Sequence, residues 1–128
     1  MNIIIKKNIM LNEFKELYND ASFKLLPDIK IIKLIKNSKY KITVYDADKL
    51  IGMGRMITDD VKMYFLCDVI VKKEYQNKKI GTLIVDTLIN MIKDKNDINI
   101  HLMASEETKG FFEKLSFKNV NIGFTYNN

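Results

Sequence analysis

Residues 68–89 read DVIVKKEYQNKKIGTLIVDTLI, and the spacing of their apolar side chains changes halfway along. A run rich in β-branched residues comes before a charged loop, as in a strand that ends at a turn. From Ile80 onward the spacing becomes i, i+3, i+4, i+7, which is typical of a helix packed on a core. The buried side of this helix is predicted to comprise Ile80, Leu83, Ile84, Thr87, Leu88, Met91 and Ile92. We therefore expect a strand, a loop and a buried helix in succession.

The loop between this strand and this helix is basic and contains one glycine. Lys78 and Lys79 stand just before Gly81, a residue that would let the backbone come close to a ligand. The first N–H groups of a helix lack partners inside it, and the helix dipole adds positive potential there. A phosphate group accepts hydrogen bonds from these N–H groups and is attracted by the potential. On these local features alone an ordinary solvated loop is favoured over an anion site, because one glycine is a weak signal.

Periodicity predicts further elements on both sides of this segment. Strands are expected over residues 3–5, 40–45, 50–57, 61–71, 98–102, 117–120 and 122–126, and helices over residues 12–20, from Pro27 and from Ser105. The run over residues 61–71 is long enough that we expect a bulge or a bend in it. A strand–helix–strand unit over residues 61–103 requires a parallel pairing, so the expected fold is α/β with a mixed sheet.

Two of the helices carry more detailed expectations. The helix from Pro27 is expected to bury Ile31, Ile32, Leu34 and Ile35. Ser105 is expected to cap the last helix, with Glu106 and Glu107 in its first turn and Phe111, Phe112 and Leu115 on its apolar side.

Composition limits the class of protein. The chain has 128 residues, a hydrophobic fraction of 47% and a net charge of +5, which favour one globular domain over residues 1–128 and an anionic partner. Its lysines are scattered, which disfavours nucleic acid. Cys67 is the only cysteine, so we expect no disulfide, no cysteine-built metal site and a reducing compartment. No segment has the length of a membrane span or the pattern of a signal peptide, so we expect a cytoplasmic protein with no membrane partner.

Two motifs together resemble the GNAT superfamily of N-acetyltransferases. Its signature is a strand that ends in V-x-V, followed by Gln/Arg-x-x-Gly-x-Gly/Ala at the start of a long helix; here Gln76 and Gly81 take the first and last positions. Downstream, GFFEKLSFKNV resembles the F-Y-E-K-L-G-F segment of the family. The resemblance implies a mixed, mostly antiparallel central sheet with helices on both faces. It also implies direct transfer, in a ternary complex, from acetyl-CoA to a small-molecule or peptide amine.

The resemblance also implies where coenzyme A would bind. The pantetheine arm would pair with the backbone of the signature strand, at Val69, Ile70 and Val71. The pyrophosphate would rest on the loop and the helix start, at Gln76, Asn77, Lys78, Lys79, Ile80, Gly81 and Thr82.

This sequence departs from the family pattern at two positions. Lys79 stands where the family has its first loop glycine, which bears on loop geometry and affinity. Phe112, expected beside the cofactor, stands where many members carry the tyrosine that protonates the leaving thiolate. A phenyl ring cannot donate a proton, so another group supplies it, the thiolate leaves unassisted, or activity is lost.

Acetyl transfer needs a deprotonated amine, for which a carboxylate is the usual helper. Asp68, next to the signature strand residues, is the first candidate, and Glu106 at the next helix start is the second. A structural charge at a bulge or strand end is an equal alternative for Asp68. Two rivals of the enzyme stay open: a coenzyme A-binding or sensing protein without turnover and, less favoured, a basic nucleic-acid-binding domain. A homodimer is also left open, and the sequence does not identify the acceptor.

Overall fold

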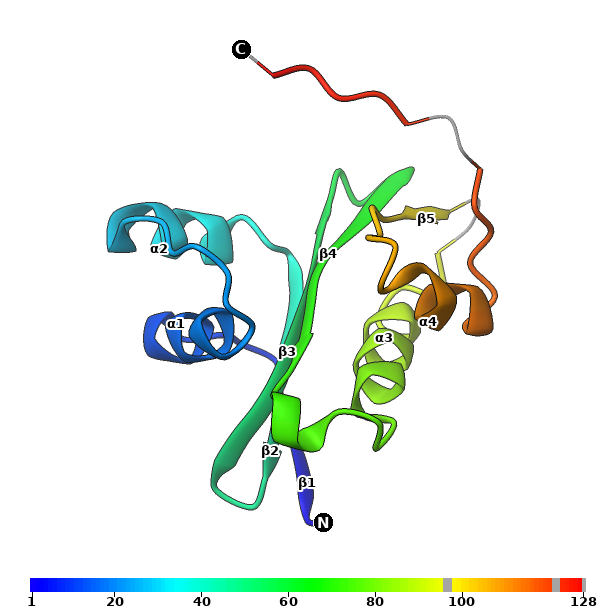
Figure 1. Ribbon diagram of the computed structural model, residues 1–128. Coiled ribbons are helices and arrows are strands. Elements are labelled where there is room, and N and C mark those ends of the chain that lie inside the picture. The colour runs from blue at the N-terminus through cyan, green and yellow to red at the C-terminus, as the bar shows by residue number, and fades with distance from the viewer. Residues whose placement is uncertain (96–97, 121–122, 128) are drawn as a thin grey trace.

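The structure is a computed structural model that describes residues 1–95, 98–120 and 123–127 (Figure 1). Its elements along the chain are β1 (Ile3–Lys6), α1 (Leu11–Asp20), α2 (Asp28–Lys36), β2 (Tyr40–Asp46), β3 (Lys49–Thr58), β4 (Met63–Val71), the short 3-10 helix η1 (Lys73–Tyr75), α3 (Ile80–Asn90), β5 (Asn99–His101) and α4 (Lys109–Lys114). In the part of the chain that the structure describes, no helix is long and apolar enough to cross a bilayer.

The strands form one sheet in the order β1-β2-β3-β4-β5. The first three pairings are antiparallel, and β4 pairs with β5 in parallel, as the strand–helix–strand unit predicted. Helices α1 and α2 cover one face of the sheet, and α3 and α4 lie on the other (Figure 1). The expected α/β fold, with a mixed and mostly antiparallel sheet between helices, is confirmed.

Strand β4 contains the bulge expected in the long run over residues 61–71. Between Gly54 and Met56 of β3 the register shifts, so that Arg55 alone faces two residues of β4, Cys67 and Asp68. One extra residue on one strand bends that strand and increases its local twist. Strand β4 therefore changes direction in its middle.

Strand β4 loses its neighbour on one side shortly before the bulge. Its parallel pairing with β5 covers only residues 63–65 of β4 and 99–101 of β5. The second half of β4 stays paired with β3 as far as Val71. The edge of β4 that faces away from β3 is thus open from Leu66 onward, as far as the described strands are concerned.

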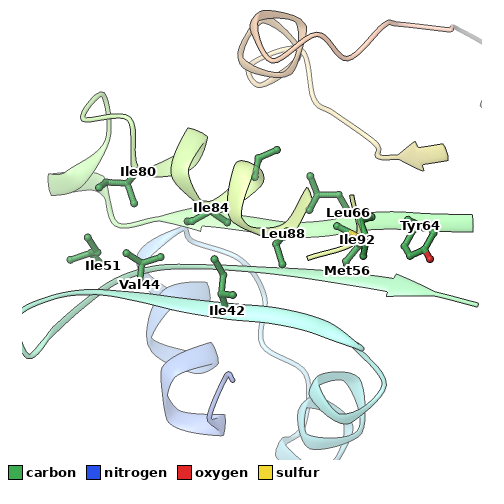
Figure 2. Close-up of a cluster of buried hydrophobic side chains, with 11 residues drawn as sticks. Ile42, Val44, Ile51, Met56, Tyr64, Leu66, Ile80, Ile84, Leu88 and Ile92 are labelled. Atoms are coloured by element: carbon green, nitrogen blue, oxygen red, sulfur yellow. The ribbon is translucent and has the colours of Figure 1, made fainter. Parts of the chain in front are cut away.

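Two clusters of buried side chains hold the helices on the sheet. The cluster between the sheet and α3 comprises Ile42, Val44, Ile51, Met56, Tyr64, Leu66, Ile80, Ile84, Val85, Leu88 and Ile92 (Figure 2). The cluster under α1 and α2 comprises Ile9, Phe14, Leu17, Ile31, Ile35, Leu50, Met53 and Ile70. Successive side chains of a strand point to opposite faces, so the same strands serve both clusters. The predicted buried side of α3 is confirmed at Ile80, Ile84, Leu88 and Ile92.

Helix α3 approaches β3 closely at Gly54. A Cβ atom at this position would lie 2.4 Å from Cγ2 of Ile84 and 3.0 Å from Cδ1 of Leu88. Both side chains are completely buried, so neither can move into solvent to make room. The missing side chain of Gly54 therefore sets how near α3 sits to the sheet.

We predict that Gly54→Ala destabilises the protein by about 1–3 kcal/mol, because an added methyl group overpacks the core beneath α3. Gly110→Ala is the matched control, because no atom of the described residues lies within 4 Å of its Cβ position in α4. Since alanine favours a helix over glycine, that control should gain up to about 1 kcal/mol. Urea unfolding measures both changes. Equal stability of Gly54→Ala and wild type would contradict the close approach.

The turn between β3 and β4 is fixed by Asp59. Its Oδ1 accepts hydrogen bonds from the backbone N–H groups of Val61, Lys62 and Met63, at 3.0, 2.9 and 3.0 Å. Val61 and Lys62 were predicted to begin the strand but belong to this turn, because these side-chain bonds replace strand pairing there.

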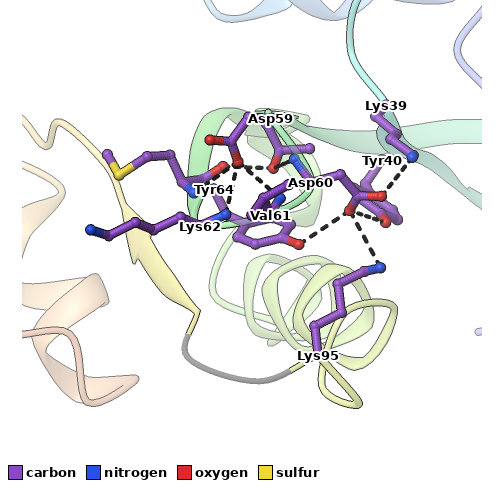
Figure 3. Close-up of polar contacts among 10 residues, drawn as sticks. Lys39, Tyr40, Asp59, Asp60, Val61, Lys62, Tyr64 and Lys95 are labelled. Carbon is purple, nitrogen blue, oxygen red and sulfur yellow. Dashed lines mark hydrogen bonds and ion pairs between the residues drawn. The ribbon is translucent and has the colours of Figure 1, made fainter.

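The next residue, Asp60, joins three parts of the fold (Figure 3). Its carboxylate accepts hydrogen bonds from Lys39 Nζ at 2.6 Å, Tyr40 Oη at 2.7 Å and Tyr64 Oη at 3.1 Å, and Lys95 Nζ lies 3.5 Å away. Lys39 and Tyr40 stand at the start of β2, and Lys95 follows α3. The bond from Lys39 above all, and then that from Tyr40, hold the pKa of the Asp60 carboxyl well below its usual range.

We predict that Asp60→Asn lowers stability at neutral pH by an amount that depends on pH. A carboxyl whose pKa is lowered in the folded state stabilises the fold above its ordinary pKa, here 3.8, and that contribution is lost as the pH falls further. The difference between the urea midpoints of wild type and mutant should therefore stay constant from neutral pH down to about pH 5. It should shrink as the pH falls below about pH 4. A gap that stays constant down to pH 3 would show that the charge of Asp60 is not its cause.

Other expectations about the helices need correction. Ile32 was expected to be buried but is 52% exposed, because the inward side of α2 is narrow and holds Ile31 and Ile35. Helix α4 begins at Lys109 rather than after Ser105, so Glu106 and Glu107 lie in the preceding turn and not in its first turn. The Oγ atoms of Ser105 and Thr108 are 3.0 Å apart, so Ser105 bonds within that turn instead of capping the helix.

The last two predicted strands are wrong where the structure describes them. Residues 117–120 and 123–126 have no strand pairing, and Ile122 lies outside the described residues. Phe124 is 99% exposed and Tyr126 is 89% exposed. Alternation of apolar side chains is a local pattern, whereas a strand also needs a neighbour with which to exchange hydrogen bonds. Strand β5 is likewise shorter than predicted and excludes Leu102.

Candidate functional site

The open edge of β4 presents backbone groups without strand partners. The N–H of Lys72 donates to the carbonyl of Ile51 on β3 at 2.8 Å. Since N–H and C=O groups alternate in direction along a strand, those of Val71 and Val69 point away from β3, toward the open edge. Gln76 donates from Nε2 to the carbonyl of Val71 at 3.1 Å and so closes the far end of this edge.

The loop after β4 adopts two left-handed backbone conformations that place the start of α3. Asn77 has φ 63° and Lys79 has φ 65°. This region favours glycine, because a side chain there crowds the backbone, which explains why glycine is the expected residue at position 79. Lys79 keeps the conformation in spite of its side chain. The left-handed conformation at position 79 is therefore compatible with lysine.

The first N–H groups of α3 are uncapped. Lys79 is the residue before the helix, and no side chain of the described residues makes a cap hydrogen bond there. The N–H of Leu83 is the first to find a helix partner, the carbonyl of Lys79 at 3.1 Å. Those of Ile80, Gly81 and Thr82 are left to an external acceptor, in a region where the helix dipole is positive.

The loop itself is anchored at several points. Tyr75 Oη donates to Asp46 Oδ2 at 2.8 Å, and the N–H of Lys73 donates to Asp20 Oδ2 at 3.0 Å. Lys72 also forms an ion pair with Glu16 of α1. The pKa of the Asp46 carboxyl is lowered, first by the N–H of Asn2 and then by Tyr75. These bonds hold the loop against the end of β2 and against α1, so the start of α3 has a defined position.

Aromatic rings of α4 pack against the start of α3. A Cβ atom on Gly81 would lie 3.1 Å from Cζ of Phe111, so close packing of this ring is a second reason for glycine here. Phe112 lies edge-to-face between Phe111 and Phe117, with ring centroids 4.9 and 5.8 Å away. Phe111, Phe112 and Leu115 are partly buried against the α3 cluster, which confirms the predicted apolar side of α4.

On the opposite face of the sheet, the bulge carries a polar network. Asp68 accepts from Arg55 Nε at 2.6 Å through Oδ2 and from Tyr18 Oη at 2.9 Å through Oδ1. Arg55 also donates from Nη1 to Ser38 Oγ at 3.1 Å, and that hydroxyl donates to the carbonyl of Leu34 at 2.8 Å. The side chains of Arg55 and Asp68 are only 12% and 15% exposed. This network joins α1, the end of α2, β3 and the bulge in β4.

The electrostatics of the network favour a hydrogen-bonding role over a nucleophilic one. Burial foremost, and then the charge of Asp68, raise the pKa of Tyr18, so its hydroxyl stays protonated and donates. Burial likewise raises the pKa of the Cys67 thiol, which disfavours the thiolate needed for nucleophilic chemistry.

Arg55 was not singled out from the sequence, although the sequence contains a signal. It is the only arginine among the 21 Lys and Arg residues of the chain. A guanidinium has a planar set of donors that bonds two acceptors at once, whereas an ammonium is a compact point charge. In a lysine-rich chain, a single arginine indicates a position where that geometry is needed. Tyr18 and Ser38 carry no comparable signal.

The two candidate carboxylates lie in different surroundings. Asp68 lies in the bulge with a hydrogen bond to each of its oxygens. Glu106 lies in the turn before α4, 87% exposed and paired with Lys109 at 2.9 Å. The structure therefore places Asp68 beside the open edge of β4 and leaves Glu106 at the surface.

We predict that replacing Arg55 alone strongly destabilises the protein, whereas replacing Arg55 and Asp68 together has a much smaller effect on stability. Arg55→Met leaves the carboxylate of Asp68 without its cation and should cost about 3–5 kcal/mol, while the double mutant Arg55→Met/Asp68→Leu should regain most of that loss. Arg55→Lys should lose about 1–3 kcal/mol, because an ammonium cannot reproduce both hydrogen bonds. Urea unfolding of the three variants tests this. A double mutant as unstable as Arg55→Met would contradict the pairing argument.

Comparison with known proteins gives a consistent result. A sequence model described as an acetyltransferase (GNAT) domain matches residues 14–127 of this chain. An uncharacterized N-acetyltransferase, ycf52, of Pyropia yezoensis is 28% identical over 115 residues, covering 87% of this chain and 66% of its own length. The chloroplastic GCN5-related N-acetyltransferase 2 of Arabidopsis thaliana is 33% identical over 112 residues, covering 72% of this chain and 43% of its own length. This chain thus matches less than two thirds of either relative.

A solved structure resembles the whole chain. A probable acetyltransferase of unknown function from meticillin-resistant Staphylococcus aureus superposes with a TM-score of 0.88. The match covers 98% of both chains at 25% sequence identity. The similarity in three dimensions therefore extends over nearly the full length of this chain.

Proposed function

Because the chain belongs to the GNAT acetyltransferase family, we propose that it transfers an acetyl group from acetyl-coenzyme A to an amine. The observation that carries this proposal is the position of two sets of backbone groups that lack strand or helix partners among the described residues. The open edge of β4 at Val69 and Val71 leads to the loop that ends at the uncapped start of α3. An elongated ligand with amide groups and a diphosphate has complementary chemistry along its length.

The residues present fit such a donor. The N–H groups of Ile80, Gly81 and Thr82, with the ammonium groups of Lys78 and Lys79, would hold the diphosphate. Backbone groups of Val69 and Val71 would hold the amide-containing arm, as an added strand does. The donor supplies the activated acetyl group when bound, and the chain supplies the position. Holding two reactants in register is by itself a large contribution to rate.

The bulge has a defined part in this proposal. Arg55 and Tyr18 hold Asp68, and through it the bend that opens the edge of β4. Asp68 would then act as a positioning residue. A role for Asp68 or Glu106 as general base stays a prediction, as do the acceptor, a cytoplasmic location and a homodimer.

A second function is supported by one feature of the site. Phe112 has no hydroxyl and packs between two other phenylalanine rings, so it cannot protonate a leaving thiolate. A protein that binds coenzyme A without turnover is therefore the alternative. An assay of thiol release over a panel of amines separates the two, since only the enzyme releases thiol faster than the uncatalysed reaction.

We predict that acetyl-coenzyme A binds and that two variants of Lys79 separate loop geometry from charge. Lys79→Gly relieves the left-handed backbone and should stabilise the free protein by about 1 kcal/mol. Lys79→Ala keeps the strained backbone and loses the ammonium, so its affinity should fall, more so at low salt. Lys114→Ala is the control, because it removes the same charge at an exposed position of α4.

Calorimetry and melting temperature with added ligand measure these effects, because a ligand that binds only the folded state raises its stability. Absence of binding at millimolar acetyl-coenzyme A would overturn the proposed function. Equal affinity of Lys79→Ala and Lys114→Ala across ionic strength would instead show that the ammonium of Lys79 does not face the diphosphate.

A further inference from the structure

An apolar surface lies on α2 and on the connection that leads into it. Its members are large side chains that the fold leaves in solvent: Phe23, Leu25, Leu26, Ile29 and Ile32. Ile29 is 78% exposed, and Phe23 and Ile32 are each 52% exposed. We refer to these five residues as the α2 surface. All of them fall within ten residues of sequence, so they form one local feature and not scattered exceptions.

The exposure follows from how α2 packs. Ile31 and Ile35 point into the cluster under α1 and α2 and are almost completely buried. Ile29 and Ile32, three residues apart, share another side of the helix, which no element of the described chain covers. Helix α2 lies beside α1 on one face of the sheet, at the edge of the molecule (Figure 1). Helix α2 therefore packs on the core through Ile31 and Ile35, without using the residues of the α2 surface.

Apart from Asp28, the charged residues within this segment are lysines. Exposed lysines are interleaved with the apolar residues, at positions 24, 30, 33 and 36. Among the described residues, none of these four lysines takes part in an ion pair, and the one acid of the segment, Asp28, is paired with Lys15 of α1 at 3.0 Å. The surface therefore combines uncompensated positive charge with apolar side chains.

The α2 surface is continuous with the network at the bulge. The ring of Phe23 lies edge-to-face with that of Tyr18, with centroids 5.4 Å apart. The hydroxyl of Tyr18 in turn bonds to Asp68, beside the open edge of β4. A molecule that lies on the α2 surface can thus extend toward the site where the acetyl group would be transferred.

From these observations we infer that the α2 surface binds an acidic, amphipathic segment of another polypeptide. Carboxylates of such a segment complement the four lysines, and its apolar side chains complement the five exposed residues. A small polar amine would leave most of this surface uncovered, and nucleic acid would use the lysines but not the apolar groups. Resting on the proposed function, the inference also names the acceptor class: the bound polypeptide carries the amine.

The binding test uses a synthetic peptide with leucine on one helical face, glutamate on the other and a fluorescent label at its C-terminus. Fluorescence anisotropy should show binding that weakens with added salt. Ile29→Ser/Lys30→Glu should weaken it at least about tenfold, because an apolar contact and an opposite charge are lost together. The matched control is Val61→Ser/Lys62→Glu in the β3–β4 turn, where Val61 is 76% exposed; its affinity should equal that of wild type.

Several outcomes overturn the inference. Wild type that does not bind the peptide contradicts it, as do two double mutants that bind equally well. A peptide with lysine in place of glutamate that binds as tightly contradicts the role of charge. Sedimentation with phosphatidylserine-containing vesicles, in the absence of peptide binding, would assign the surface to a membrane instead.

The acceptor part is tested separately on the same peptide with a free N-terminal amine. Turnover with acetyl-coenzyme A should occur, and Ile29→Ser/Lys30→Glu should raise KM while leaving kcat unchanged. Peptide that binds but is not acetylated, by an enzyme that acetylates other amines, overturns the acceptor class and leaves the docking surface in place. A protein that binds the peptide but no acetyl-coenzyme A overturns the proposed function and with it the acceptor class, and leaves only the docking surface in place.

Discussion

The ion pair between Arg55 and Asp68 lies at the one point where β3 and β4 do not match residue for residue, and it joins the two strands there. An extra residue in a strand leaves the ladder irregular, and a nearly buried carboxylate in that position needs compensation. Arg55 supplies the charge, while Tyr18 and Ser38 attach the pair to the helices of that face. The bend in β4 lies at this junction, close to the point where β4 has separated from β5 and its edge is open.

Close packing on the other face completes the site. Gly54 lets α3 approach β3, and Gly81 lets the ring of Phe111 approach the start of α3. The left-handed residues Asn77 and Lys79 then turn the chain from β4 into that helix. The strand edge and the helix start are therefore neighbours because of two glycines and two left-handed residues.

Positive charge serves different purposes in different places. Arg55 forms an ion pair with Asp68 that joins two strands. Lys39 and Lys95 stabilise the turn between β3 and β4 through Asp60. Lys78 and Lys79 stand at the start of α3, where the helix dipole has the same sign. The lysines of α2 are not paired within the described chain. The net charge of +5, which is the excess of 21 basic over 16 acidic residues, therefore does not by itself show where an anion would bind.

The sequence by itself determined the elements whose side chains repeat with a clear period, from the strand at Tyr40 to the helix at Ile80, and it indicated a bulge in a strand too long to stay regular. It also placed Val69, Val71 and Gly81 at a strand end and a helix start, because a local pattern defines both. Tertiary structure alone decided the partners. Tyr18 and Asp68 are 50 residues apart in the chain, and the exposure of Ile32 depends on which side of α2 meets the sheet. Residues 117–120 and 122–126 alternate as strands do, yet in the part of the chain that the structure describes residues 117–120 and 123–127 belong to no strand, since alternation specifies a face and not a neighbour.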